Sequence, residues 1–171
     1  GVARMALNGF SWVIPGRLAG CAIPGGSVSA PEEYVASDLR DLHAEGIRCL
    51  VSLQRMPDRT GDLCAEVGLT WVQYPIDDFD VPRDTASYSA LVDEIIGLMR
   101  IDRPVCVHCR AGVGRTGMVL ACVMGRYFAI DGAKAMEAVR KVRPAGDTPE
   151  QERFVDGFCA ADPQEARRRA R

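Results

Sequence analysis

The chain has 171 residues, of which 47% are hydrophobic and 26% charged, and its formal net charge is −2. This composition predicts one soluble globular domain with a single core, extending over residues 1–171. The small net charge does not favour binding to nucleic acid or to an anionic membrane, and no apolar run approaches the roughly 20 residues that cross a bilayer.

The predicted elements alternate between short strands and helices. In chain order they are strands over 10–14 and 17–21, a helix over 31–46, a strand over 47–53, a short helix over 58–67, a strand over 69–74, a helix from about 84 that ends before 104, a strand over 104–107, and helices over 115–128, over 132–142 and from 148 onward. This alternation predicts an α/β fold with a mostly parallel central sheet and helices on both faces. The arginine-rich residues 164–171 are expected to form a polar tail.

The cysteines indicate a reducing environment. Seven are present, mostly within apolar runs, which predicts buried free thiols and a cytoplasmic protein. No signal peptide is expected, because no long apolar region follows the first residues. Cys106 and Cys109 leave open a redox pair or half of a zinc site. No second pair of Cys or His stands at metal-ligand spacing, so we expect neither a metal nor another cofactor.

One stretch carries most of the chemical information. An apolar strand ending at Val107 leads through His108, Cys109 and a glycine-containing loop into an apolar helix that begins near Arg115. Such a loop points backbone N–H groups at a common centre, and the helix adds the positive end of its dipole. The predicted phosphate-binding residues are Arg110, Ala111, Gly112, Val113, Gly114 and Arg115.

Cys109 lies at the floor of this predicted anion site. A cysteine attacks as the thiolate, which a helix N-terminus and nearby cations favour. The Arg115 guanidinium can bind two oxygens of a phosphate, and Thr116 places a hydroxyl near the thiolate. These groups predict attack of Cys109 on phosphorus and a phosphocysteine intermediate that water hydrolyses. A buried structural cysteine beside a helix cap is the alternative, but it leaves Arg115 unexplained.

His108-Cys109, five residues and then Arg115-Thr116 resembles the signature of the protein tyrosine phosphatase superfamily. The opening Phe10 to Gly20 is similar to that of the small atypical dual-specificity phosphatases. The resemblance implies a cytosolic, metal-independent phosphatase of phosphotyrosine, and often of phosphoserine and phosphothreonine, in proteins. We expect the protein to be a monomer.

Two alternatives from other classes stay open. The first is a phosphatase of inositol phosphates, phosphoinositides or RNA 5′-phosphates. Lipid 3-phosphatases carry basic residues on both sides of the Ala-Gly pair, whereas this chain has Arg110 and Val113 there, which weakens the phosphoinositide interpretation. The second is a catalytically silent phosphate-binding module, which the intact Cys109 and Arg115 disfavour.

The resemblance also implies an aspartic acid on a mobile loop about thirty residues before the cysteine. Asp78 stands 31 residues before Cys109 and directly before Phe79, so it is the predicted general acid. Asp77 and Asp80 stay open as alternatives, whereas Asp84 is better explained as the N-cap of the next helix.

Two further side chains are predicted to support the site. His108 is expected to bond the loop and tune the thiol rather than to act as a general base. Gln151 fits a capping box with Thr148, which we favour. The resemblance also implies that the segment from Arg143 to Gln151 lies near the catalytic loop. Arg55 and Arg59 are either cleft residues or ordinary surface charges.

Overall fold

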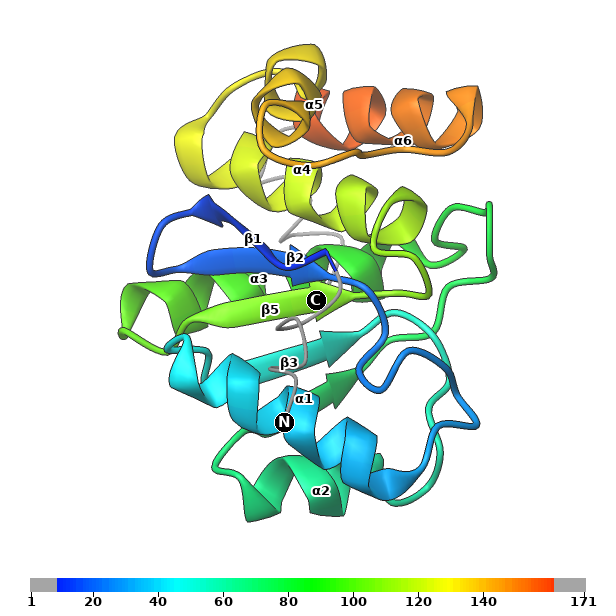
Figure 1. Cartoon of the computed structure of the whole chain (residues 1–171). Coiled ribbons are helices and arrows are strands. Elements are labelled where there is room, and N and C mark those ends of the chain that lie inside the picture. The colour runs from blue at the N-terminus through cyan, green and yellow to red at the C-terminus, as the bar shows by residue number, and fades with distance from the viewer. Residues whose placement is uncertain (1–8, 162–171) are drawn as a thin grey trace.

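The computed structural model describes residues 9–161 as a five-stranded sheet with helices on both faces, in the strand order β1-β2-β5-β3-β4 (Figure 1). The elements in chain order are β1 (Ser11–Ile14), β2 (Leu18–Cys21), α1 (Glu32–Ala44), β3 (Cys49–Ser52), α2 (Thr60–Glu66), β4 (Thr70–Gln73), α3 (Thr85–Arg100), β5 (Val105–His108), α4 (Gly114–Phe128), α5 (Gly132–Arg140) and α6 (Pro149–Ala160). The predicted tail over 164–171 lies outside the described residues.

The sheet is mostly parallel, as predicted. β2, β5, β3 and β4 run in the same direction, and β1 pairs antiparallel with β2 at one edge. The carboxyl ends of the parallel strands therefore meet at one side of the sheet. In open α/β sheets this is the side at which ligands bind, and here it receives the loop that follows β5.

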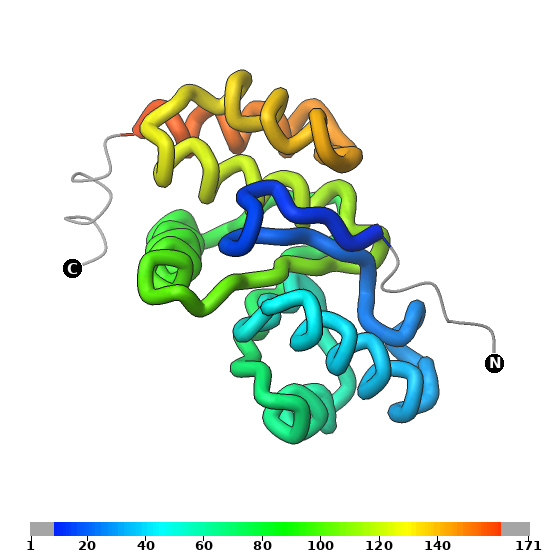
Figure 2. Tube along the Cα trace, turned by 60° about the vertical axis from the view of Figure 1, so that its left-hand side comes forward, coloured from blue at the N-terminus to red at the C-terminus, as the bar shows by residue number. Residues whose placement is uncertain are grey.

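Helices α3, α4, α5 and α6 cover one face of the sheet, and α1 and α2 cover the other (Figures 1 and 2). Successive side chains of a strand point to opposite faces. In β5, Val105 and Val107 therefore join the core under α3 and α4, whereas Cys106 joins the core under α1 and α2. Helix α4 lies between the sheet and the α5–α6 pair, which explains why nearly all of it is apolar and buried.

The helix ends follow the sequence signals closely. Pro31 precedes the first residue of α1, and Gly46 follows the helix at φ 104°. Asp84 caps α3 as predicted, because its carboxylate accepts hydrogen bonds from two backbone N–H groups of the first turn. Helix α5 ends at Arg140, two residues earlier than expected.

The predicted free thiols are confirmed for the seven cysteines, six of which are buried. The Cys106 sulfur lies 3.5 Å from that of Cys21, in the core under α1 and α2. Cys109 belongs to the core on the opposite face. The fold therefore pairs Cys106 with Cys21 rather than with Cys109. Among residues 9–161, no helix is both long and apolar enough to cross a membrane.

Candidate active site

The loop between β5 and α4 forms the centre of the site. β5 ends at His108, and α4 begins at Gly114, so Arg115 and Thr116 lie in the first turn of the helix. Cys109 is only 3% exposed. The fold therefore brings the predicted thiol, arginine and hydroxyl together beside one helix N-terminus.

The peptide groups of this loop are oriented by hydrogen bonds from outside it. His108 Nδ1 donates to the Cys109 carbonyl oxygen at 2.8 Å, and the Ile23 N–H donates to that of Arg110 at 3.0 Å. Arg143 Nη2 donates to the Gly112 carbonyl oxygen at 2.7 Å, and the Gly146 N–H donates to that of Val113 at 3.1 Å. The C=O and N–H of a trans peptide point in opposite directions. The N–H groups of the four following residues, Arg110, Ala111, Val113 and Gly114, therefore point away from these donors. This arrangement is what an oxyanion cradle requires.

His108 is held by a hydrogen-bond network that fixes its tautomer. Because a carbonyl oxygen only accepts, Nδ1 carries the proton that His108 donates to the Cys109 oxygen. Nε2 then accepts from the Ser52 hydroxyl at 2.6 Å, and the Ser52 oxygen accepts from Trp71 Nε1 at 2.9 Å. Burial is the main cause that lowers the pKa of His108 to about 4, so the ring is neutral at pH 7. Both ring nitrogens are occupied, as a supporting role requires.

Arg115 connects the catalytic loop to the acidic loop after β4. Its Nη1 donates to the Ile76 carbonyl at 2.9 Å, and its Nη2 lies 3.3 Å from an Asp78 carboxylate oxygen. Arg115 Nε and the Thr116 hydroxyl are buried and have no hydrogen-bond partner among the described residues. Buried polar atoms without partners are rare, and these two belong to the first turn of α4, directly after the loop that holds Cys109.

The three candidate acids have different partners. Asp77 is exposed and pairs with Arg83 at 3.3 Å. Asp80 accepts from the Val81 N–H at 2.7 Å and lies 4.0 Å from Arg83. Of the three, Asp78 is the one that the described structure places against Arg115. The next residue, Phe79, is 61% exposed with φ 62°, a conformation that few non-glycine residues adopt.

Gln151 combines parts of both predicted roles. Thr148 caps α6 through its hydroxyl, which accepts from the Gln151 N–H at 3.1 Å. The Gln151 side chain does not reach back to Thr148. Instead, Oε1 accepts from the Asp147 N–H at 2.8 Å, and Nε2 donates to the Asp80 carbonyl at 3.1 Å. The buried Gln151 amide therefore ties the acidic loop to the start of α6.

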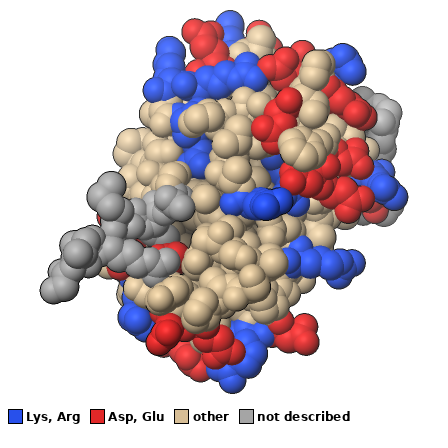
Figure 3. Space-filling model, turned by 45° about the vertical axis from the view of Figure 1, so that its right-hand side comes forward, with Lys and Arg blue, Asp and Glu red and all other residues tan. Residues whose placement is uncertain are grey.

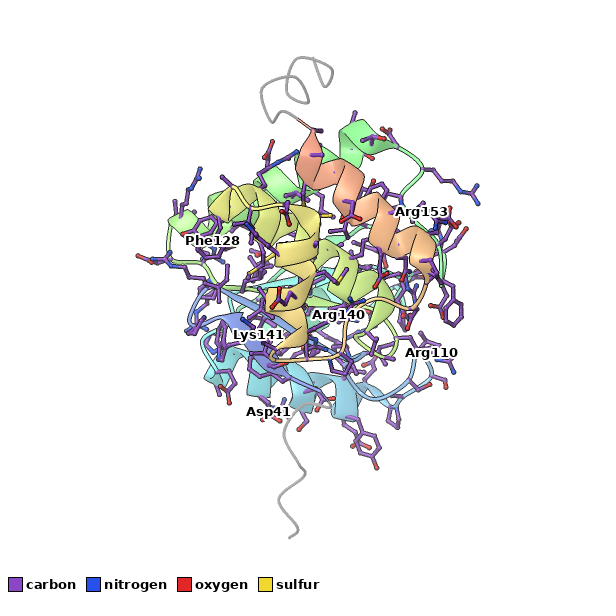
Figure 4. The ribbon with its side chains drawn as sticks, turned by 90° about the horizontal axis from the view of Figure 1, so that it is seen from above. Asp41, Arg110, Phe128, Arg140, Lys141 and Arg153 are labelled. Atoms are coloured by element: carbon purple, nitrogen blue, oxygen red, sulfur yellow. The ribbon has the colours of Figure 1, made fainter. Side chains whose placement is uncertain are left out.

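A cleft of about 490 Å³ opens beside Arg115. Its lining comprises Ile23, Gly26, Ser27, Val28, Gln54, Arg110 and Arg115. Arg110 is exposed and forms no ion pair within residues 9–161, and Figure 4 shows it well apart from Lys141 at the end of α5. Figure 3 turns the carboxyl ends of the strands toward the reader and shows acidic side chains gathered at one side of this surface.

The two other candidate arginines do not line this cleft. Arg59 pairs with Glu32 at 3.2 Å and with Glu66 at 3.8 Å, which places it in an ion-pair cluster between α1 and α2. Arg55 is exposed. Within the described part of the chain, no group of three or more His, Cys, Asp or Glu side chains could hold a metal ion.

Sequence reasoning did not find Ser52 and Trp71, which hold His108, and it placed Arg143 near the site only by resemblance. A polar residue at the end of the apolar strand β3 was a usable signal for Ser52, because buried hydroxyls need partners. Nothing in the local sequence indicated that Arg143 reaches Gly112.

Comparisons with known proteins identify the family of the chain. A family model described as "Polymorphic toxin system, DSP-PTPase phosphatase" matches residues 19–128. Cyclin-dependent kinase inhibitor 3 of Rattus norvegicus is 27% identical over 136 residues, covering 74% of this chain and 63% of that protein. Dual specificity protein phosphatase CDC14B of Mus musculus is 24% identical over 161 residues, covering 88% and 31%. The chain thus spans less than two thirds of the length of these relatives.

Solved structures share the fold. Tk-PTP in its active form gives a TM-score of 0.76 with 22% identity, covering 90% of this chain and 98% of that one. PTPMT1 gives 0.73 with 19% identity, covering 94% and 98%. The opening at Phe10 also resembles that of dual-specificity phosphatase 23, and this finer likeness stays a prediction. Because the family model matches more than half of the chain, the chain belongs to the DSP-PTPase phosphatases, the dual-specificity branch of the protein tyrosine phosphatase superfamily.

Proposed function

We propose that this protein hydrolyses phosphomonoesters of proteins through a phosphocysteine intermediate on Cys109. The observation that carries the proposal is the cradle of oriented N–H groups around Cys109, closed by Arg115 and its contact with Asp78. A cradle alone would bind phosphate. The thiol at its floor and the carboxylate at its rim add the two groups that ester cleavage needs.

In the first step, the Cys109 thiolate attacks phosphorus and forms the S–P bond while the P–O ester bond breaks. The loop N–H groups and Arg115 stabilise the charge on the equatorial oxygens. Asp78, in its protonated form, gives its proton to the leaving oxygen, so the alcohol or phenol departs neutral. The Thr116 hydroxyl donates to the sulfur.

In the second step, water attacks phosphorus and the S–P bond breaks. The Asp78 carboxylate takes a proton from the water, which restores the acid for the next cycle. The electron pair of the S–P bond returns to Cys109 as the thiolate, which the Thr116 hydroxyl and the helix N-terminus stabilise. Inorganic phosphate then leaves the cradle. The reaction consumes one water and uses no cofactor.

Phosphotyrosine, phosphoserine and phosphothreonine in proteins are the proposed substrates. The names of the relatives support this class, since CDC14B is a dual specificity protein phosphatase. A cytoplasmic location and a monomeric state stay predictions. A phosphoinositide is the second candidate, because Arg110 is an exposed cation at the cleft beside Arg115, and a structural neighbour, PTPMT1, was solved in complex with PI(5)P.

The mechanism is tested by hydrolysis of para-nitrophenyl phosphate in the presence of EDTA. The wild-type protein should be active and Cys109→Ser inactive. Cys159→Ser should retain activity, because Cys159 lies near the end of α6 and outside the loop between β5 and α4. Full activity in Cys109→Ser would rule out the thiol mechanism. An inactive wild type that still binds tungstate would identify a binding module.

The substrate class is tested by comparing kcat/KM for a phosphotyrosine peptide, a phosphothreonine peptide and PI(5)P in micelles. We expect the peptides to be preferred at least tenfold. A preference of the same size for the lipid would replace the protein substrate with the second candidate.

A further inference from the structure

Arg143 connects the loop between β5 and α4 with segments that the proposed reaction does not use. It follows α5, and its residue is only 6% exposed. Nη1 donates to the Gly9 carbonyl at 2.7 Å, to the Ser11 hydroxyl at 2.9 Å and to the Gly20 carbonyl in β2. Nη2 donates to the Gly112 carbonyl at 2.7 Å. One guanidinium therefore joins the edge of the sheet to the middle of the catalytic loop.

Glycines on both sides leave room for this guanidinium. A Cβ on Gly20 would lie 3.0 Å from Arg143 Cζ and 2.9 Å from a Leu120 methyl carbon. A Cβ on Gly112 would lie 2.7 Å from Arg143 Nη2, and Gly112 has φ 76°. The backbone therefore approaches the guanidinium at two distant positions that a side chain would block.

The bond to Gly112 sets the direction of one peptide group. Holding the Gly112 oxygen toward Arg143 turns the N–H of Val113 to the opposite side. The guanidinium therefore lies on the side of this peptide opposite to the Val113 N–H. We infer that Arg143 is a positioning residue, which holds the Gly112–Val113 peptide with its N–H directed at the bound oxyanion.

Arg143 differs from the other donors that orient the loop. Ile23 and Gly146 donate through backbone N–H groups, and His108 is adjacent to Cys109 in the chain. Arg143 is the charged side chain among these donors, and it polarises the peptide it holds. A flip of the Gly112–Val113 peptide would replace a donor with a carbonyl oxygen, which repels the phosphate. The inference rests on the proposed site, and binding of an oxyanion tests it without any turnover.

The test measures tungstate affinity by calorimetry in wild type, Arg143→Met, Arg143→Lys and Lys141→Met. Lys141→Met is the matched control, because Lys141 is exposed and forms no ion pair in the described part of the chain. All measurements are made at a temperature at which circular dichroism shows each variant folded. We expect Arg143→Met to weaken binding at least tenfold and Lys141→Met to change it less than twofold. The Val113 N–H resonance should shift on tungstate binding in wild type.

Arg143→Lys keeps the charge and a donor, so it tests the inference if the methionine variant fails to fold. We expect it to fold, to bind tungstate at least threefold more weakly than wild type, and to show a smaller shift of the Val113 N–H resonance. A purely structural role would lower the melting temperature and leave both readouts unchanged. The inference would be overturned if a folded Arg143→Met had wild-type tungstate affinity and a wild-type shift of the Val113 N–H resonance. If Arg143→Met does not fold, the same result for Arg143→Lys would overturn it. A wild type that binds tungstate but hydrolyses nothing would count against the proposed function alone.

Discussion

The Asp78 carboxylate lies 3.3 Å from the Arg115 guanidinium, so the proposed acid and the proposed phosphate-binding arginine are ion-paired in the structure. A phosphate dianion needs the same guanidinium. Substrate binding therefore exchanges one anion for another on Arg115 and frees the carboxyl group for the leaving oxygen. This competition links the acidic loop to the occupancy of the cradle.

The first prediction concerns Asp78. Asp78→Asn should lower kcat on an alkyl phosphate by about 10²–10⁴, because the leaving oxygen loses its proton donor. It should also bind inorganic phosphate more tightly, since the anion that competes for Arg115 has gone. Steady-state kinetics and product inhibition measure the two effects. Asp77→Asn, at an exposed partner of Arg83, serves as the control. A fully active Asp78→Asn beside an inactive Asp80→Asn would transfer the role to Asp80.

The second prediction concerns the support of His108. Ser52→Ala removes the partner of both His108 Nε2 and Trp71 Nε1. Leaving buried polar atoms unpaired should lower the free energy of unfolding by about 1–3 kcal/mol, and kcat should fall because the ring is no longer held. Urea unfolding and kinetics check this. Ser87→Ala, at an exposed hydroxyl on α3, should cost about 0.5 kcal/mol or less. An equal loss of unfolding free energy in Ser52→Ala and Ser87→Ala would argue against the hydrogen-bond network around His108.

The third prediction concerns pH. His108 has a pKa of about 4 in the folded protein, below its ordinary value of 6.5. Between these values the unfolded state binds the proton and the folded state does not. Stability therefore falls as the pH drops from 6.5 to 4, by about 3 kcal/mol from this residue. The measurement is the difference in unfolding free energy between wild type and His108→Asn across this range. A difference that stays constant with pH would show that His108 titrates normally.

The fourth prediction concerns Gly112. Its φ is 76°, and a Cβ there would lie 2.5 Å from the Cys21 carbonyl oxygen. Gly112→Ala should therefore cost about 1–3 kcal/mol of stability and weaken phosphate binding. A Cβ on Gly97, in the middle of α3, would have nothing within 4 Å, so Gly97→Ala should stabilise the protein by about 0.5–1 kcal/mol. Calorimetry measures both. If Gly112→Ala changed neither the stability nor the phosphate affinity, the loop would have to adopt another conformation.

Much of the fold followed from the sequence, because its signals are local. The apolar periodicity of α3, the Asp84 cap and the Pro31 start each depend on residues within one or two turns. The loop from Cys109 to Arg115 is equally local, since strand, glycine-containing turn and helix start are consecutive. These parts could be predicted without knowing how the chain packs.

The supporting contacts could not be predicted in the same way. The Gln151 side chain reaches the Asp80 carbonyl in another loop, whereas the local capping-box pattern suggested that it reaches back to the Thr148 backbone N–H. Trp71 bonds Ser52 across the β3–β4 pair, where a tryptophan alone suggests only packing. Each contact depends on which strands and loops become neighbours, and a single sequence does not encode this in any short pattern.

The donors that orient the catalytic loop have a consequence for how the protein loses activity. The Ile23 N–H donates to the Arg110 carbonyl, and the Arg143 guanidinium donates to the Gly112 carbonyl. These hydrogen bonds join segments that are far apart along the chain. Contacts of such long range form only when most of the domain has folded. The cradle is therefore a product of cooperative folding rather than of its own loop, and fragments that lack the segment after α5 should have an intact Cys109 sequence but no oxyanion site.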